Sequence, residues 1–134
     1  MENQDERVLK IARCAFDAFA RGNKIGEWQD FLDSLHEKVV LYIPAPGEFQ
    51  GKNVGKARAA QFCRFISIEQ NARLDFHEPH RITQMGNTVV FEFEDEGTIA
   101  GRAISNRIAM SFDVGDGKIA EIREYVGIIP APPK

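Results

Sequence analysis

Apolar and polar residues alternate with a period of two along the last third of the chain. Over Ile104–Val114, apolar side chains fall on one side and mainly small or polar ones on the other, which predicts a half-buried strand. Asp116-Gly117 supplies the positive φ angles of a tight hairpin turn, and a second strand follows up to Val126. Asn106 and Glu124 interrupt these otherwise apolar faces. A buried polar group without a partner costs stability, so both positions are candidates for function.

The first half of the chain has mainly the spacing of amphipathic helices. One helix is predicted over residues 5–21, where Gly22-Asn23 is a stop signal. A shorter helix is predicted from Gly26 to about His36, with an apolar face that includes Trp28. The β-branched run over residues 39–43 predicts a strand that ends at a proline, and a third helix carries Phe62, Phe65 and Ile66.

Strand periodicity then continues to the end of the chain. The segments 74–78, 82–84 and 88–96 are predicted strands separated by turns. In the last of them, Asp95 continues the apolar row of Phe91 and Phe93, whereas the opposite face is acidic. Three helices followed by hairpin-linked strands predict an α+β fold: one strongly curved, mainly antiparallel sheet wrapped around three N-terminal helices.

The length and composition fit one domain over residues 1–134, with 43% hydrophobic residues to build its core. The 17 basic and 20 acidic residues form no basic run, so no nucleic-acid partner is expected. No apolar run approaches the length of a membrane span, and the charged N-terminus is unlike a signal peptide. We therefore expect a cytoplasmic protein without a membrane partner, in which Cys14 and Cys63 are reduced.

The histidines and glycines do not form a recognisable cofactor motif. His36, His77 and His80 lack metal-ligand spacing, and the glycines do not match a phosphate-binding loop, so neither a metal nor a cofactor is expected. His80 shares strand parity with Phe76 and Ile82, provided that the intervening proline keeps the register. It is either a partly buried strand residue or part of a pocket wall.

The order of these elements resembles the nuclear transport factor 2-like superfamily, particularly its SnoaL-like and ketosteroid-isomerase-like branch. The resemblance covers almost the entire chain, and its strongest part is the pattern GKIxxxxEY, which starts at Gly117 and ends with Glu124 and Tyr125. It implies a cone-shaped sheet whose concave face encloses an apolar pocket. Members include isomerases, aldol cyclases, dehydratases, an epoxide hydrolase and non-catalytic proteins, so the fold alone does not name a reaction.

Two subfamilies match only in part. Ketosteroid isomerases carry a catalytic aspartate before the proline that follows the first strand, where this chain has Ile43. Limonene-epoxide-hydrolase-like proteins hold two carboxylates bridged by an arginine. Asp95 and Glu124 match these carboxylates, whereas Phe93 replaces the arginine and Tyr42 replaces an asparagine. Both of those mechanisms are therefore disfavoured.

The remaining carboxyls can still carry acid/base chemistry. If Asp95 and Glu124 face one apolar cavity, burial and mutual repulsion raise at least one pKa, and the pair can act as general acid and general base. Asn106 and Tyr42 would orient a carbonyl group or water. The expected pocket wall consists of Trp28, Phe91, Phe93, Ile122, Met110 and His80.

Structural explanations stay open for the same residues. Glu124 can pair with Arg107 or Arg123 across the hairpin, Asp95 can lie exposed at the strand end, and Asn106 can satisfy backbone groups only. The stripe that includes Trp28 can simply be core.

Three functions follow: an isomerase, cyclase or dehydratase of a small apolar carbonyl compound, a non-catalytic binder of a lipid-like or polyketide-like molecule, or a protein-interaction module. The mixed outer face of the hairpin, which includes Arg123 and Tyr125, suits a homodimer interface.

Overall fold

The computed structural model describes residues 2–128. Within this range, helices come first and strands dominate the second half. The elements in chain order are α1 (Gln4–Ile25), α2 (Gln29–Asp33), β1 (Leu35–Ile43), β2 (Gly51–Val54), α3 (Lys56–Arg64), the π-helical turn η1 (Phe65–Glu69), β3 (Ala72–Phe76), β4 (Arg81–Met85), β5 (Thr88–Ile99), β6 (Arg102–Gly115) and β7 (Lys118–Ile128).

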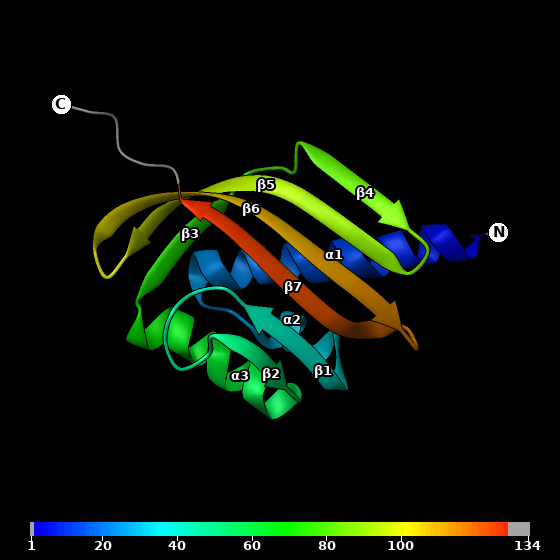
Figure 1. The fold of residues 1–134 in the computed structure, drawn as a ribbon, viewed down its shortest axis with the longest axis horizontal. Helices are drawn as coiled ribbons and strands as arrows, with labels where there is room; N and C mark the ends of the chain where they lie inside the picture. The colour runs from blue at the N-terminus through cyan, green and yellow to red at the C-terminus, as the bar shows by residue number, and fades with distance from the viewer. Residues whose placement is uncertain (1, 129–134) are drawn as a thin grey trace.

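The seven strands form one sheet in the order β2-β1-β7-β6-β5-β3, and β4 pairs with the first half of β5. All pairs are antiparallel except β1 with β7. Figure 1 shows the long strands arching over α1, with α3 next to β1 and β2. These features confirm the predicted α+β fold with a curved, mainly antiparallel sheet around three helices.

Helix α1 extends beyond its predicted end. The helix continues through Gly22-Asn23 to Ile25, and Gly26, with a φ of 76°, ends it in the left-handed conformation. Gly22 is therefore not a stop signal. A Cβ at this position would lie 2.2 Å from the ring of Trp28, so glycine lets the tryptophan pack against the helix.

The predicted second helix is shorter because its last part joins the sheet. Helix α2 covers only Gln29–Asp33, and Leu35 already pairs with Ile119 of β7. The amide of Ile119 also donates to the Ser34 carbonyl at 2.9 Å. The apolar side chains of 26–36 fit a helix pattern, but strand pairing from Leu35 onward satisfies the backbone and decides the outcome.

One half of the concave face is filled by aromatic packing. The ring of Phe16, from α1, stacks on Phe91 at 4.6 Å between centroids and meets Phe93 edge-on at 4.9 Å. Phe91 in turn contacts Phe112 of β6 at 5.4 Å. The first two-thirds of α1 therefore cover this part of the sheet as solid core.

The other half of the concave face stays open where β1 ends. Proline lacks the amide that a ladder needs, and β1 stops at Ile43, before Pro44. Its parallel pairing with β7 reaches Arg123 and stops there. Glu124 is thus the first residue of β7 beyond the stretch that pairs with β1, although it still pairs with β6.

Candidate functional site

A cavity of about 300 Å³ lies at this end of the sheet. It is bounded by β3, β5, β6 and β7, by the end of α1, by α3 with η1, and by the end of β1 with the loop that follows. Most of its wall is apolar. The lining residues are Phe19, Asn23, Ile43, Pro44, Ala45, Pro46, Phe49, Phe62, Phe65, Ile66, Gln70, Ala72, Leu74, Phe76, Asp95, Ile99, Ile104, Asn106, Ile108, Glu124 and Val126.

Asp95 reaches the cavity from β5 and is only 2% exposed. Its position pairs with Asn106 on β6, so the two side chains stand next to each other on the concave face. The Asn106 side-chain amide donates to Asp95 Oδ1 at 2.9 Å. Asp95 Oδ2 is buried and has no hydrogen-bond partner among residues 2–128.

Two opposing effects act on the pKa of Asp95. Burial raises the pKa, because removal from water disfavours the charged form, and hydrogen bonds from Asn106 lower it. Burial is the larger effect, so the pKa lies above its ordinary value.

Glu124 reaches the same cavity from β7 and is partly accessible. No side chain of the described chain forms a hydrogen bond or an ion pair with its carboxyl group. Burial, reinforced by the negative charge of Asp95, raises its pKa to about 7. Glu124 can therefore both donate and accept a proton near neutral pH.

The arginines that could neutralise Glu124 have other partners on the outer face. Arg107 contacts Glu94 at 3.3 Å. Arg123 donates to Asp113 at 2.8 Å and also pairs with Glu121. The predicted alternative of a Glu124 ion pair across the hairpin is therefore wrong, and the carboxyl lies on the side of the sheet away from both arginines.

Four residues expected in the pocket wall belong to the solid core instead. Phe91, Phe93, Met110 and Ile122 lie on the concave face, at no more than 2% exposure, but none of them lines the cavity. For the two phenylalanines the cause is Phe16 of α1, which packs against both rings. Strand parity predicted correctly that these residues lie on the concave face of the sheet. It did not predict which part of that face borders the cavity.

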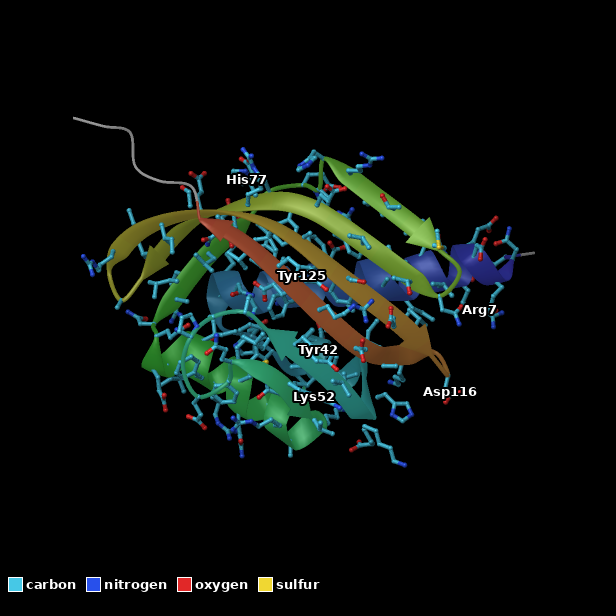
Figure 2. The ribbon with its side chains drawn as sticks, in the orientation of Figure 1. Arg7, Tyr42, Lys52, His77, Asp116 and Tyr125 are labelled. Atoms are coloured by element: carbon cyan, nitrogen blue, oxygen red, sulfur yellow. The ribbon has the colours of Figure 1, made fainter. Side chains whose placement is uncertain are left out.

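Three further candidates lie away from the cavity. Tyr42 is 37% exposed because β1 alternates and its inward positions are Leu41 and Ile43; Figure 2 shows Tyr42 on β1. Trp28 is buried beside α1 and donates from Nε1 to Ser67 Oγ at 2.7 Å. His80 is exposed beside a shallow groove on the outer face. The expectation that these three line the pocket is not met.

Other cavity residues were not predicted as site residues. Asn23 is buried near the end of α1, where its amide donates to the Phe19 carbonyl at 3.0 Å. An asparagine on the apolar stripe of a helix was a usable signal, but it was interpreted as a helix stop. The loop Pro44–Pro46 and Gln70 carry no comparable pattern in the sequence.

The described part of the chain offers no obvious site for a metal. Within residues 2–128, no group of three or more His, Cys, Asp or Glu side chains could hold an ion together. In the same range, no helix is long and apolar enough to cross a membrane.

Comparisons with known proteins agree with this architecture. The sequence profile of the SnoaL-like domain family matches residues 12–122. Among curated proteins, none matches the chain significantly. The structure is similar to that of a nuclear transport factor 2-like protein from Anabaena variabilis, with 42% identity, a TM-score of 0.86, and coverage of 95% of this chain and 94% of that one.

More distant structures share the fold. A candidate polyketide cyclase of Xanthomonas campestris has 20% identity and a TM-score of 0.74, with 92% of each chain covered. A candidate isomerase of Rhodopseudomonas palustris has 19% identity and a TM-score of 0.72, with coverage of 87% and 88%. On the evidence of the family profile and the 42% identical structure, this chain belongs to the SnoaL-like family of the nuclear transport factor 2-like superfamily.

Proposed function

We propose that the protein catalyses proton transfer on a small apolar carbonyl compound, in an isomerisation, cyclisation or dehydration. The observation that carries this proposal is Glu124, an unpaired carboxyl in an apolar cavity whose pKa of about 7 suits a general acid or base. The cavity lies at the small end of the usual range for small-molecule sites.

The two carboxyls would divide the work. Since the negative charge of Asp95 holds the Glu124 proton in place, the favoured arrangement is a charged Asp95 beside a protonated Glu124. Asp95 Oδ2, which has no partner, would remove a proton from the carbon next to the carbonyl group. Glu124 would donate its proton to the carbonyl oxygen as the enol forms, so the pair needs no other acid or base.

The names of distant relatives support this chemistry without specifying it. Both cyclisation and isomerisation of carbonyl compounds pass through an enol, and proteins described as candidate cyclase and candidate isomerase share this fold. Because their identities with this chain are 20% and 19%, they support the reaction class only as an analogy.

The test is proton exchange in deuterated water. A panel of small ketones, examined by proton NMR, reports loss of the hydrogen next to the carbonyl group even when no net product forms. We expect wild-type protein to accelerate exchange of at least one ketone. Glu124→Gln and Asp95→Asn should each lower the rate by about 100-fold or more, the usual contribution of an acid or base.

Glu94→Gln is the matched control, because Glu94 lies on the opposite face of β5 and pairs with Arg107 at 3.3 Å. It should retain wild-type exchange. Exchange that persists in both site variants would contradict the assigned roles.

Non-catalytic binding is the second candidate function. It is favoured by the apolar lining and by the lack of an arginine in it within residues 2–128, because Phe93, at the position where the resembled epoxide hydrolases carry that arginine, is buried in the core. Ligand binding in the cavity, with no proton exchange for any ketone of the panel, would select this function over catalysis.

A further inference from the structure

The ionisable side chains that line the cavity are all acidic. Its lining includes two carboxyls, Asp95 and Glu124, and three amides, Asn23, Gln70 and Asn106, but no lysine, arginine or histidine. The neighbouring arginines have other partners. Arg107 and Arg123 are bound to carboxylates on the outer face, and Arg58, which stacks on Phe49 at 3.9 Å from the ring centroid, pairs with Glu48 at 3.1 Å. A negatively charged ligand would therefore enter a cavity of its own sign without a cation to meet it.

Asp95 adds a specific requirement. This side chain is 2% exposed, lines the cavity and carries an oxygen, Oδ2, without a hydrogen-bond partner in residues 2–128. A buried acceptor of this kind costs stability until a donor reaches it. Asn106 already donates to the other oxygen, at 2.9 Å, so Oδ2 is left to accept a hydrogen bond from a molecule in the cavity.

We propose that the ligand of this cavity is an uncharged, mainly apolar molecule with a hydroxyl or enol group that donates to Asp95 Oδ2. This inference rests on the proposed function, because it assigns the substrate class of the same site. The hydroxyl group lies between the two carboxyls, and the apolar body lies against the phenylalanines that line the cavity near α3 and η1.

A hydroxyl group matches this pair better than an ammonium group. No hydrogen bond joins Asp95 to Glu124 in the structure, so their interaction is one of charge alone. A hydroxyl group can donate to the charged Asp95 and accept from the protonated Glu124 at the same time. An ammonium group has donors only, and its charge would lose most of its hydration in a largely apolar cavity.

The apolar body has a defined place. Phe49, Phe62 and Phe65 pack together, with ring centroids 5.4 and 5.1 Å from Phe49 to the other two. They lie on the side of the cavity formed by α3, η1 and the loop after β1. A flat hydrocarbon the size of naphthalene would bury its faces against such rings.

Four matched probes test the proposal by titration calorimetry at neutral pH. They are naphthalene, β-naphthol, β-naphthalenesulfonate and β-naphthylmethylammonium, which share one body and differ in the polar group. We expect β-naphthol to bind at least about 10-fold more tightly than naphthalene, the value of one hydrogen bond to a charged acceptor. Both charged probes should bind more weakly than β-naphthol.

Two variants test whether the preference for β-naphthol over naphthalene depends on Asp95. Asp95→Ala should abolish the advantage of β-naphthol over naphthalene, whereas Glu94→Gln should leave it unchanged. Equal binding of naphthol and naphthalene, tighter binding of either charged probe, or no binding of the four would each overturn the proposal. The wild-type comparison alone decides this if Asp95→Ala does not fold.

The naphthol titration and the ketone-exchange experiment can succeed or fail independently of each other. A naphthol preference without ketone exchange would leave the ligand assignment standing and remove catalysis. Ketone exchange without a naphthol preference would do the reverse.

Discussion

At the scale of single residues, the proposed site depends on three side chains: Asp95, Asn106 and Glu124. Each is a polar side chain on the concave face of a sheet, where an apolar residue would cost less. Asp95 accepts a hydrogen bond from Asn106 on one oxygen and has no partner on the other, and the Glu124 carboxyl forms no side-chain hydrogen bond or ion pair within residues 2–128. Such a constellation lowers stability, and a proton or a ligand relieves it.

The pH dependence of stability follows from Glu124. Its pKa is about 7 in the folded protein against 4.5 as the ordinary value, so the folded state holds the proton more tightly. Protonated Glu124 therefore contributes its full stabilisation of the folded state below about pH 4.5. This stabilisation is lost as the pH rises through 7 and the carboxyl becomes charged. The loss amounts to about 3 kcal/mol at most.

Denaturant titrations of wild-type protein and Glu124→Gln between about pH 5 and pH 8 measure this effect, because the variant cannot titrate. We expect the variant to gain stability relative to wild type as the pH rises. A stability difference that stays constant over this range would contradict the raised pKa, and Glu94→Gln controls for the loss of a carboxyl as such.

The sequence predicted these three residues for a physical reason. In a strand, parity alone assigns a side chain to a face, so a carboxyl in an apolar row is visible without a structure. Tyr42 failed as a prediction because its role came from a resemblance, whereas parity with the inward residues Leu41 and Ile43 places it outside.

At the scale of elements, the site depends on where strands stop and bend. The ladder between β6 and β7 shifts register between Asp113 and Val114, which leaves Ala120 as an extra residue. Ile119 and Ile122 are both buried as a result, at 0% and 2% exposure. Strict alternation predicts opposite faces for these two isoleucines, and a bulge of this kind has no clear signal in the sequence.

Gly97 gives a test of the strand pairing that supports Asp95. It pairs with Leu74 across β5 and β3, and a Cβ there would lie 2.0 Å from the Arg73 carbonyl oxygen. Gly97→Ala must push β3 away from β5, next to the Phe76–Asp95 pair. We expect a loss of about 1–3 kcal/mol or more in the free energy of unfolding, measured by denaturant titration.

The matched control is Gly127→Ala, in β7, where the nearest atom to an added Cβ is 3.7 Å away. It should change stability far less than Gly97→Ala. Equal effects of the two substitutions would show that the close approach of β3 to β5 is not what requires glycine.

At the scale of the whole molecule, one concave face has two different halves. Helix α1 fills one half through Phe16, while the other half stays hollow beyond the end of β1. The sequence predicts which residues face inward but not how far a helix reaches along the sheet, because that depends on crossing geometry. Phe91, Phe93, Met110 and Ile122 were assigned to the pocket for this reason.

The outer face of the sheet remains a proposed interface. Tyr125 is 60% exposed there, and Arg123 is held flat by Asp113 and Ser111. Such a surface of aromatic and internally paired charged residues suits a second copy of the chain, so the homodimer stays a prediction.

The carboxyl titration of Glu124, followed by carbon-detected NMR on wild-type protein and Asp95→Asn, tests the central claim most directly. The account predicts an apparent pKa near 7 in wild type. It also predicts a lower value in Asp95→Asn, because that variant removes the negative charge beside Glu124. Titration of wild-type Glu124 near its ordinary value of 4.5 would contradict the account, since the carboxyl would then be surrounded by water and not by the wall of an apolar cavity.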